Sequence, residues 1–544
     1  MRGTRNRQRL AVALSVVVLA LVASACGSRL SGNQAALAQG AVGRSGTAGS
    51  GTGTGAQALG SASTNCTSSS STTTTTAASG SKATTTTTKP KATTPTSSTT
   101  TTTPCSSSGP GLASGTPGSG SSGSHPGASG TGGANPAALA GVSSGSGVCG
   151  ANGNQAPAGG NGGATATGVT ATTITVGNIA SISGVAPGLT QSAQQATEAW
   201  AAYVNSTGGI CGRQVKVQPF DDGNDSGQNN ADASQACSSD FAMVGNASGF
   251  DDGGAQAVSS CGIPDMSAEV STAAAGGTAD IFGASPGNDH YWAIGPANYL
   301  KSLYPNAIQH AAMIYLQVPA TQTQAAHEIA AYTQDGFKYT PAGGIPTTPT
   351  NANYGSIVQE MQGNGTQYVT EYSDDNSAER LLQAMQQANY TPQVVDWFSE
   401  EYSPQFAQQT APESNGDLVL MSATAGYDDA SSNPGLQLME SWLNRVAGSG
   451  NWHQDIFAIL AWSAGLAFEQ AAKQVGPDLT RPALISKIQA ITSWTGGGIT
   501  PVVNIGGKVP TKCFFYEKIE NGAFQRVYPT APNTYDCNSG YVQY

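Results

Sequence analysis

The chain has 544 residues, 33 of them acidic and 22 basic, and a formal net charge of −11. Nine of the bases precede Thr170 and all the acids follow it, which leaves 13 bases against 33 acids, a net charge of −20, in the later part. This charge excludes binding to nucleic acid and docking on anionic lipid, because phosphate groups would be repelled.

The first 25 residues have the pattern of an export signal. Four arginines precede an apolar run over residues 10–22, which is too short for a transmembrane span. The run leads into LVASAC, which ends at Cys26 and is typical of a bacterial lipobox whose cysteine becomes lipidated. The alternative is an ordinary secretory signal cleaved near Ala25. We therefore expect the mature chain at the extracellular face of the membrane, held there by lipid on Cys26.

Residues 26–168 are predicted to form a disordered linker rich in Ser, Thr and Gly. The stretch over 27–166 has no acidic and no aromatic residue, so it cannot bury enough apolar area to offset its conformational entropy. Its threonine runs near prolines are typical of an O-glycosylated stalk, and an unmodified flexible linker is the alternative. Either would carry the remaining residues 169–544 away from the membrane.

The folded part begins with a β-α-β unit over residues 174–225. A short strand is followed by a helix in which apolar residues from Ala193 to Val204 recur near 3.6-residue spacing. Gly208-Gly209 ends the helix, and the alternating residues 215–217 form the next strand. Such a unit crosses over right-handedly into a parallel sheet.

The same alternation of strand and helix continues to the end of the chain, which predicts doubly wound sheets. Residues 455–474 are apolar nearly all round, which predicts a buried helix. Further strands are predicted over 241–245, 263–267, 311–316, 367–371, 394–398, 418–421, 502–505 and 513–519. Further helices are predicted over 230–239, 255–261, 325–334, 354–362, 378–388 and 482–491.

The order GG-I-x-G-x-x-V, strand, DDxxD over residues 208–225 resembles the first unit of type I periplasmic binding proteins. It is most similar to the branched-chain amino-acid (Leu/Ile/Val) receptors of ABC transporters. The resemblance implies an α/β fold of two doubly wound parallel-sheet lobes joined by a three-strand hinge. The expected bounds are about 170–291 and 428–508 for lobe 1, and about 292–427 and 509–544 for lobe 2.

Ligands of open parallel sheets lie outside the carboxyl ends of the strands. Small-residue loops follow three first-lobe strands, and their free N–H groups at helix N-termini suit a carboxylate. By position, the resemblance assigns Ser248, Gly249 and Phe250, together with Val270 and Ser271, to the α-carboxylate and α-amino groups of the ligand. The alternative is that these loops are merely tight α/β turns.

In the second lobe the resemblance implies an acid that binds the ammonium group of the ligand. Glu400 or Glu401 is expected to fill that role, and a solvated charge pair is the alternative. Asp374 stands where relatives often carry an aromatic residue, and Leu189 stands where some carry Trp. These departures argue against an ordinary leucine-type pocket.

Nine cysteines in an exported chain imply disulfides. Two pairs follow from expected positions at helix ends and at the tail, and two more from elimination. The predicted pairs are Cys237–Cys261 and Cys513–Cys537, then Cys149–Cys211 and Cys66–Cys105. None of the cysteines has the spacing of zinc ligands, so neither a metal nor another cofactor is expected.

Three functions are compared. The first is a receptor that binds a small polar solute, an amino acid or a related amide or acid, and delivers it to the permease subunits of an ABC importer. The second is a ligand sensor for a signalling system on the same fold. The third, an enzyme, is disfavoured because the folded part has no G-x-S-x-G elbow, no H-E-x-x-H and no phosphate-binding loop. The membrane is expected as a partner only through the lipid anchor.

Overall fold

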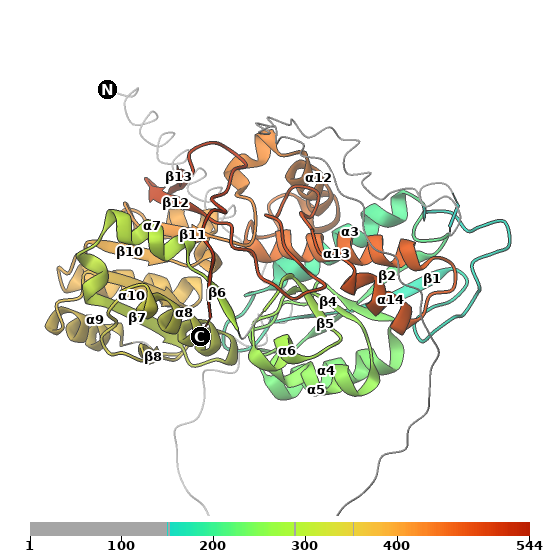
Figure 1. The fold of residues 1–544 in the computed structure, drawn as a ribbon, viewed down its shortest axis with the longest axis horizontal. Helices are drawn as coiled ribbons and strands as arrows, with labels where there is room; N and C mark the ends of the chain where they lie inside the picture. Colours follow the sequence, from blue (N-terminus) through green and yellow to red (C-terminus); the bar gives the residue numbers. More distant parts are fainter. Residues whose placement is uncertain (1–148, 151–152, 288–289, 352, 544) are drawn as a thin grey trace, which may run out of the picture. The chain divides into compact units, whose positions relative to one another are not determined.

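The computed structural model describes residues 149–150, 153–287, 290–351 and 353–543. The expected signal peptide, Cys26 and the predicted pair Cys66–Cys105 lie outside these residues. The described chain is an α/β fold built on two open, mainly parallel sheets, each covered by helices (Figure 1). This confirms the expected fold class.

The first sheet has five parallel strands in the order β2-β1-β3-β4-β5. Burial alternates at the start of β1, where Ile174 and Val176 lie in the core, and the rest of the strand is buried throughout. The strand bounds are β1 Thr173–Ala180, β2 Gln214–Asp221, β3 Ala242–Val244, β4 Asp265–Glu269 and β5 Ile281–Ser285.

Helices cover both faces of the first sheet. In Figure 1, α4 and α5 lie on one face, and α13, packed against α3 and α14, lies on the other. Asp225 and Asp455 accept hydrogen bonds from backbone N–H groups at the starts of α4 and α13, which fixes where these helices begin. The bounds are α3 Gln191–Ser206, α4 Ser226–Ser239, α5 Asp252–Cys261, α6 Ala273–Gly277, α12 Pro434–Leu443, α13 Ile456–Val475 and α14 Arg481–Gln489.

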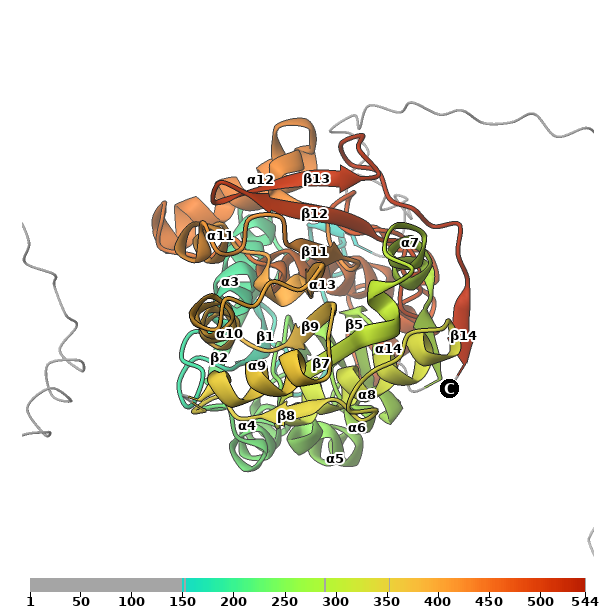
Figure 2. The same cartoon turned by 90° about the vertical axis from the view of Figure 1, so that its left-hand side faces the viewer.

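The second sheet has seven strands in the order β13-β12-β11-β10-β9-β7-β8. The strands from β11 to β8 are parallel, and β12 and β13 add an antiparallel hairpin at one edge (Figure 2). The strand bounds are β7 Ala311–Leu316, β8 Ile345–Thr347, β9 Tyr368–Tyr372, β10 Val394–Trp397, β11 Leu418–Met421, β12 Phe515–Glu520 and β13 Ala523–Tyr528.

The helices of the second sheet divide between two cores. Apolar residues of α9, α10 and α11 belong to the larger core cluster, and those of α7 and α8 belong to a separate cluster on the other face. The bounds are α7 Gly295–Leu303, α8 Pro319–Gln334, α9 Tyr354–Gly363, α10 Asp375–Gln387 and α11 Pro404–Thr410, with short helical turns η3 Ala307–His310, η4 Ser399–Glu401, η5 Tyr427–Ser432 and η6 Asn444–Gly448.

The chain passes between the two sheets three times, after β5, after β11 and after α14. Beside the first crossing, β6 (Tyr291–Ala293) pairs in antiparallel fashion with β14 (Tyr541–Gln543), so the C-terminal segment lies along a crossing strand. These three crossings correspond to the expected hinge.

Two expectations about segments were wrong. The linker was expected to reach residue 168, yet Arg213, which is fully buried, donates hydrogen bonds to the carbonyl oxygens of Asn161 and Gly163. The segment therefore packs on the first lobe because its backbone satisfies a buried guanidinium, which composition does not reveal. Residues 502–505 form only isolated bridges, among them Trp494 with Val503, and join neither sheet.

Three disulfides lie in the described part of the chain, and they are the pairs proposed for it from the sequence. Cys237–Cys261 joins the C-terminal ends of α4 and α5. Cys513–Cys537 ties the C-terminal segment to the stretch that leads directly into β12. Cys149–Cys211 ties the start of the described segment to the loop before β2.

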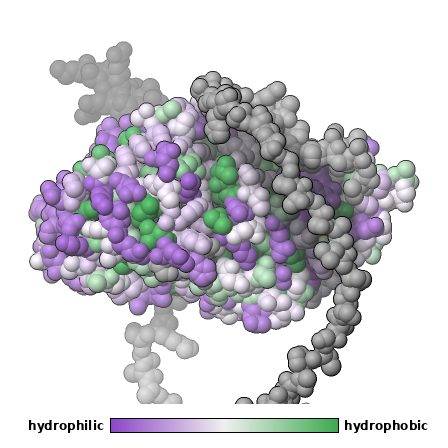
Figure 3. Space-filling view, in the orientation of Figure 1, coloured by the Kyte–Doolittle hydropathy of each residue, from purple (hydrophilic) through white to green (hydrophobic). Residues whose placement is uncertain are grey.

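The face of the protein seen in Figure 3 is mostly hydrophilic, with small hydrophobic patches between polar residues. Within the described residues, no helix combines the length and the apolar character that a membrane crossing needs.

Candidate functional site

Loops at the carboxyl ends of strands from both sheets meet across a cleft. The loops after β1, β3 and β4 face those after β7, β9 and β10. Two hydrogen bonds join the lobes there: the Ala320 N–H donates to the Gly249 carbonyl at 3.1 Å, and Gln324 Nε2 donates to Glu269 Oε1 at 3.3 Å. The cleft therefore lies where open parallel sheets bind ligands.

One buried carboxylate organises the first-lobe side of the cleft. Asp222, directly after β2, accepts hydrogen bonds from Ser181 Oγ at 2.8 Å, from Asn229 Nδ2 at 3.0 Å and from Ser248 Oγ. Ser248 Oγ in turn accepts from the Phe250 N–H at 2.9 Å. A single carboxylate thus fixes the loops that follow β1, β2 and β3.

We expect Asp222→Asn to destabilise the fold by about 1–2 kcal/mol, because hydrogen bonds to a charged acceptor are replaced by weaker neutral ones. The amide also places a donor where several hydroxyl and amide donors converge. Urea unfolding followed by circular dichroism measures the change. An unfolding midpoint equal to that of the unchanged chain would contradict this role for Asp222.

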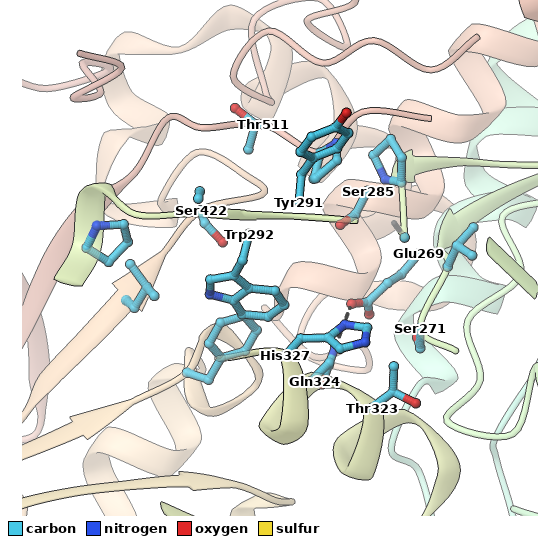
Figure 4. A pocket seen from close by; sticks show the side chains of 18 of the residues that line it. Glu269, Ser271, Ser285, Tyr291, Trp292, Thr323, Gln324, His327, Ser422 and Thr511 are labelled. Atoms are coloured by element: carbon cyan, nitrogen blue, oxygen red, sulfur yellow. Dashed lines mark hydrogen bonds between the residues drawn. The ribbon is translucent and has the colours of Figure 1, made fainter. Parts of the chain in front are cut away.

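Two cavities lie in the cleft and share Glu269, Ser271 and Gln324 in their walls. The larger, of about 130 Å³, has a mixed wall in which aromatic side chains such as Trp292 and Phe398 lie beside polar ones such as Thr323. The smaller has about 60 Å³. Figure 4 shows Glu269 pointing into the larger cavity toward Gln324 and His327, with Trp292 beside His327. The two cavities therefore adjoin each other, and the Glu269 carboxyl group lies in the wall that they share.

Acidic side chains dominate the electrostatics of the cleft. Burial, and secondarily the nearby Asp251, raise the pKa of Glu269 to about 7. Burial and the facing Glu269 raise the pKa of Glu400 well above its ordinary value. Burial raises the pKa of Glu401 as well, with Glu400 and Asp375 adding to the effect. In all three cases burial is the largest cause, and neighbouring carboxyl groups add to it.

The structure brings most of the expected site residues together. Two of them do not line the smaller cavity. Val270 lies in the wall of the larger cavity, next to Ser271, which both cavities share. Glu401 is fully buried and accepts a hydrogen bond from Ser373 Oγ at 3.2 Å, and it lines neither cavity. The expected residues around the smaller cavity are Leu189, Ser248, Gly249, Phe250, Ser271, Asp374 and Glu400.

Asp374 has a structural task in this wall. Its carboxylate caps α10, accepting from the Asn376 and Ser377 N–H groups and from Ser377 Oγ. An aspartate in the position before a helix is a common N-cap, so the sequence carried this signal.

Sequence reasoning missed Glu269, Gln324 and Asp251. Glu269 ends a strand whose other residues are buried, and an acid at such a position is a signal that could have identified it. Gln324 lies on α8, and no local pattern marks the face of that helix that reaches the other lobe.

The backbone donors expected to hold a ligand carboxylate already have partners. The Ser271 N–H donates to Asp251 Oδ2 at 2.8 Å, and the Phe250 N–H donates to Ser248 Oγ. The Asp251 carboxylate therefore already binds the Ser271 N–H, which was expected to bind the α-carboxylate of the ligand. Among the described residues no group of three or more His, Cys, Asp or Glu side chains is placed to hold a metal ion.

A family model described as "Periplasmic binding protein" matches residues 173–523. No curated protein matches the chain.

Solved structures share the fold at low identity. A fatty acid ABC transporter substrate-binding protein from Thermomonospora curvata is 17% identical with a TM-score of 0.57, covering 70% of this chain and 100% of that one. A possible leucine/isoleucine/valine-binding protein from Rhodopirellula baltica is 11% identical with a TM-score of 0.57, covering 65% and 96%. A solute binding protein of an ABC transporter from R. palustris, in complex with benzoate, is 16% identical with a TM-score of 0.53, covering 66% and 97%.

Proposed function

Because the chain belongs to the periplasmic binding protein family, we propose that it is an extracellular receptor that binds a small organic solute and delivers it to the permease of an ABC importer. The observation that carries the proposal is the pair of adjoining cavities between the lobes, lined from the strand ends of both sheets. A cavity divided between two lobes couples ligand binding to lobe closure, which a permease can recognise.

Three features support this function. The lobes are joined by three crossings, which is the arrangement that hinge closure needs. The Ala320–Gly249 and Gln324–Glu269 hydrogen bonds join the lobes directly across the cleft. The solved structures of similar fold are named for fatty acid, for leucine, isoleucine or valine, and for benzoate, so the fold accommodates small organic solutes of differing shape.

The proposed location follows from the first 26 residues. Lipid on Cys26 would keep the receptor at the outer face of the cell membrane, and residues 26–148 would allow its folded part to stand away from that membrane. Mass spectrometry of the protein extracted from membranes should show a diacylglycerol-modified Cys26 as the N-terminal residue. An unmodified N-terminus at or before Cys26 would rule the anchor out.

Binding is tested by titrating the full chain with a panel of amino acids, amides, amines, fatty acids and aromatic acids. We expect one chemical class to raise the melting temperature by a few degrees, because a ligand at about 100 times its Kd adds about 2.7 kcal/mol of stability. Isothermal titration calorimetry then measures the Kd.

A matched pair of variants locates the binding site. Gly249→Trp places an indole in the smaller cavity and should abolish binding, whereas Gly343→Trp, at an exposed glycine with open space around it, should not. A chain that responds to no solute, or a Gly249→Trp variant that binds as before, would contradict the proposed site.

A further inference from the structure

Two carboxylates from opposite lobes line the smaller cavity. Glu269 is the last residue of β4 in the first lobe, and Glu400 lies in η4 of the second. Glu400 Oε2 is buried and has no hydrogen-bond partner among the described residues. The fully buried Glu401 beside it also has an Oε2 without a partner there. A buried carboxylate oxygen without a donor is costly unless a ligand supplies one.

Within the part of the chain that the structure describes, the cavity walls around these carboxylates hold no side chain of permanent positive charge. Among the described residues that line the two cavities there is no Lys or Arg. Arg380 lies behind the wall, where its Nη2 donates to the Pro349 carbonyl at 2.9 Å and to Ser377 Oγ at 2.7 Å. His327 is the one titratable base in the lining, and it lies in the larger cavity near Glu269 (Figure 4).

The same cleft disfavours a ligand carboxylate. The Ser271 N–H, one of the donors such a group would use, is bound to Asp251. Burial raises the pKa of Asp251 to about 6, which leaves it ionised above that pH and repulsive to an incoming anion. At pH 8 a second anion placed beside Asp251 and Glu269 would meet like charge.

The larger cavity supplies a place for an apolar body. Trp292, Phe398 and Leu420 line it, and its wall includes Glu269. An ammonium group at Glu269 would therefore have aromatic and aliphatic surface within reach on one side and the Glu400 carboxylate on the other. Aromatic faces also attract cations through their quadrupoles.

We propose that this receptor takes a small organic amine without a carboxylate, its ammonium group held between Glu269 and Glu400 and its apolar body in the larger cavity. The inference rests on the proposed receptor function and narrows its solute class. The ammonium supplies the donors that the buried carboxylate oxygens lack, and its charge favours the ionised form of both carboxyl groups, which burial disfavours. Amino acids and fatty acids enter poorly, because each brings a carboxylate to an acidic site.

Two series of probes with matched carbon skeletons test the proposal. The first is 3-methylbutylamine, leucine and 4-methylpentanoate, and the second is 2-phenylethylamine, phenylalanine and 3-phenylpropanoate. Each is titrated into the full chain by calorimetry at pH 8, where an ordinary imidazole is neutral and the amines are charged. We expect an amine to bind at least about tenfold more tightly than its amino acid, and the acids to give no binding heat.

Variants test the two carboxylates separately. Glu269→Gln and Glu400→Gln should each weaken amine binding by about 10- to 100-fold, because each removes a charge-assisted hydrogen bond. Both variants relieve a buried charge and should fold, which thermal unfolding verifies. Glu360→Gln, at an exposed position of α9 outside both cavities, should bind the amine as the unchanged chain does.

The outcomes separate this proposal from the receptor function. Tighter binding of an amino acid or acid than of the matching amine would overturn the amine proposal and leave the receptor standing. The same holds if a non-amine solute of the wider panel binds while no amine does. Amine binding that Glu269→Gln and Glu400→Gln leave unchanged would also overturn it. If no solute of any class binds, both proposals fail.

Discussion

The protein is expected to be more stable against unfolding at pH 5 than at pH 8. Several carboxylates are buried in the second lobe beside tyrosine hydroxyls rather than cations. Glu328 accepts from Tyr372 at 2.7 Å, and Asp396 accepts from Tyr368 at 2.8 Å. Burial is the main cause that raises the pKa of Glu328 to about 8 and of Asp396 to about 7.

The direction follows from proton binding. In the unfolded chain these carboxyl groups return to pKa values near 4, so between about pH 4 and pH 8 the folded state holds more protons. Their stabilising contribution is complete below the unfolded pKa and is lost as the pH rises through the folded one. At about 1.4 kcal/mol per pKa unit, Glu328 alone accounts for a loss on the order of 4 kcal/mol.

Thermal unfolding between pH 4.5 and pH 8.5 measures this dependence. Glu328→Gln cannot ionise and should flatten the profile, whereas Glu360→Gln, at an exposed position of α9, should leave it unchanged. A melting temperature that rises from pH 5 to pH 8 would contradict the assignment.

Replacing Gly465 with alanine is expected to destabilise the first lobe by about 1–3 kcal/mol. Gly465 lies in α13 against the indole of Trp200, which is fully buried on α3. A Cβ at this position would lie 2.4 Å from Trp200 Cδ2 and 2.5 Å from Cγ. Because Trp200 also packs edge-on against Phe468, with ring centroids 5.7 Å apart, the indole has little room to move.

A matched change in a different helix separates packing from helix propensity. Gly363 ends α9, and a Cβ there would meet no atom within 4 Å. Gly363→Ala should therefore raise the free energy of unfolding by up to about 1 kcal/mol. Gly465→Ala should lower it, because the clash with Trp200 outweighs the same gain in helix propensity. Urea midpoints of the two variants give the comparison. Equal shifts of the same sign would show that the α3–α13 contact does not require glycine.

Local sequence patterns predicted the elements in which neighbouring residues decide the structure. The alternation over residues 174–225 predicted a β-α-β unit, and the structure has β1, α3 and β2 there. The apolar run over 455–474 predicted a buried helix, and α13 spans Ile456–Val475 with 15 of its 20 residues buried. Short strands such as β6 and β14 escaped prediction because they pair with each other over a long distance along the chain, which no local pattern marks.

By itself, the sequence determined the α/β class, since periodicity and turn residues act over short distances. Its resemblance to a known family predicted the two lobes and the strand ends that carry the candidate site. Only the tertiary structure decided how that site is charged. Asp251 reaches the Ser271 N–H, and Glu269 faces Glu400 from the other lobe. These groups are far apart along the chain, so no local pattern shows that they meet. Their burial raises the free energy needed to charge them.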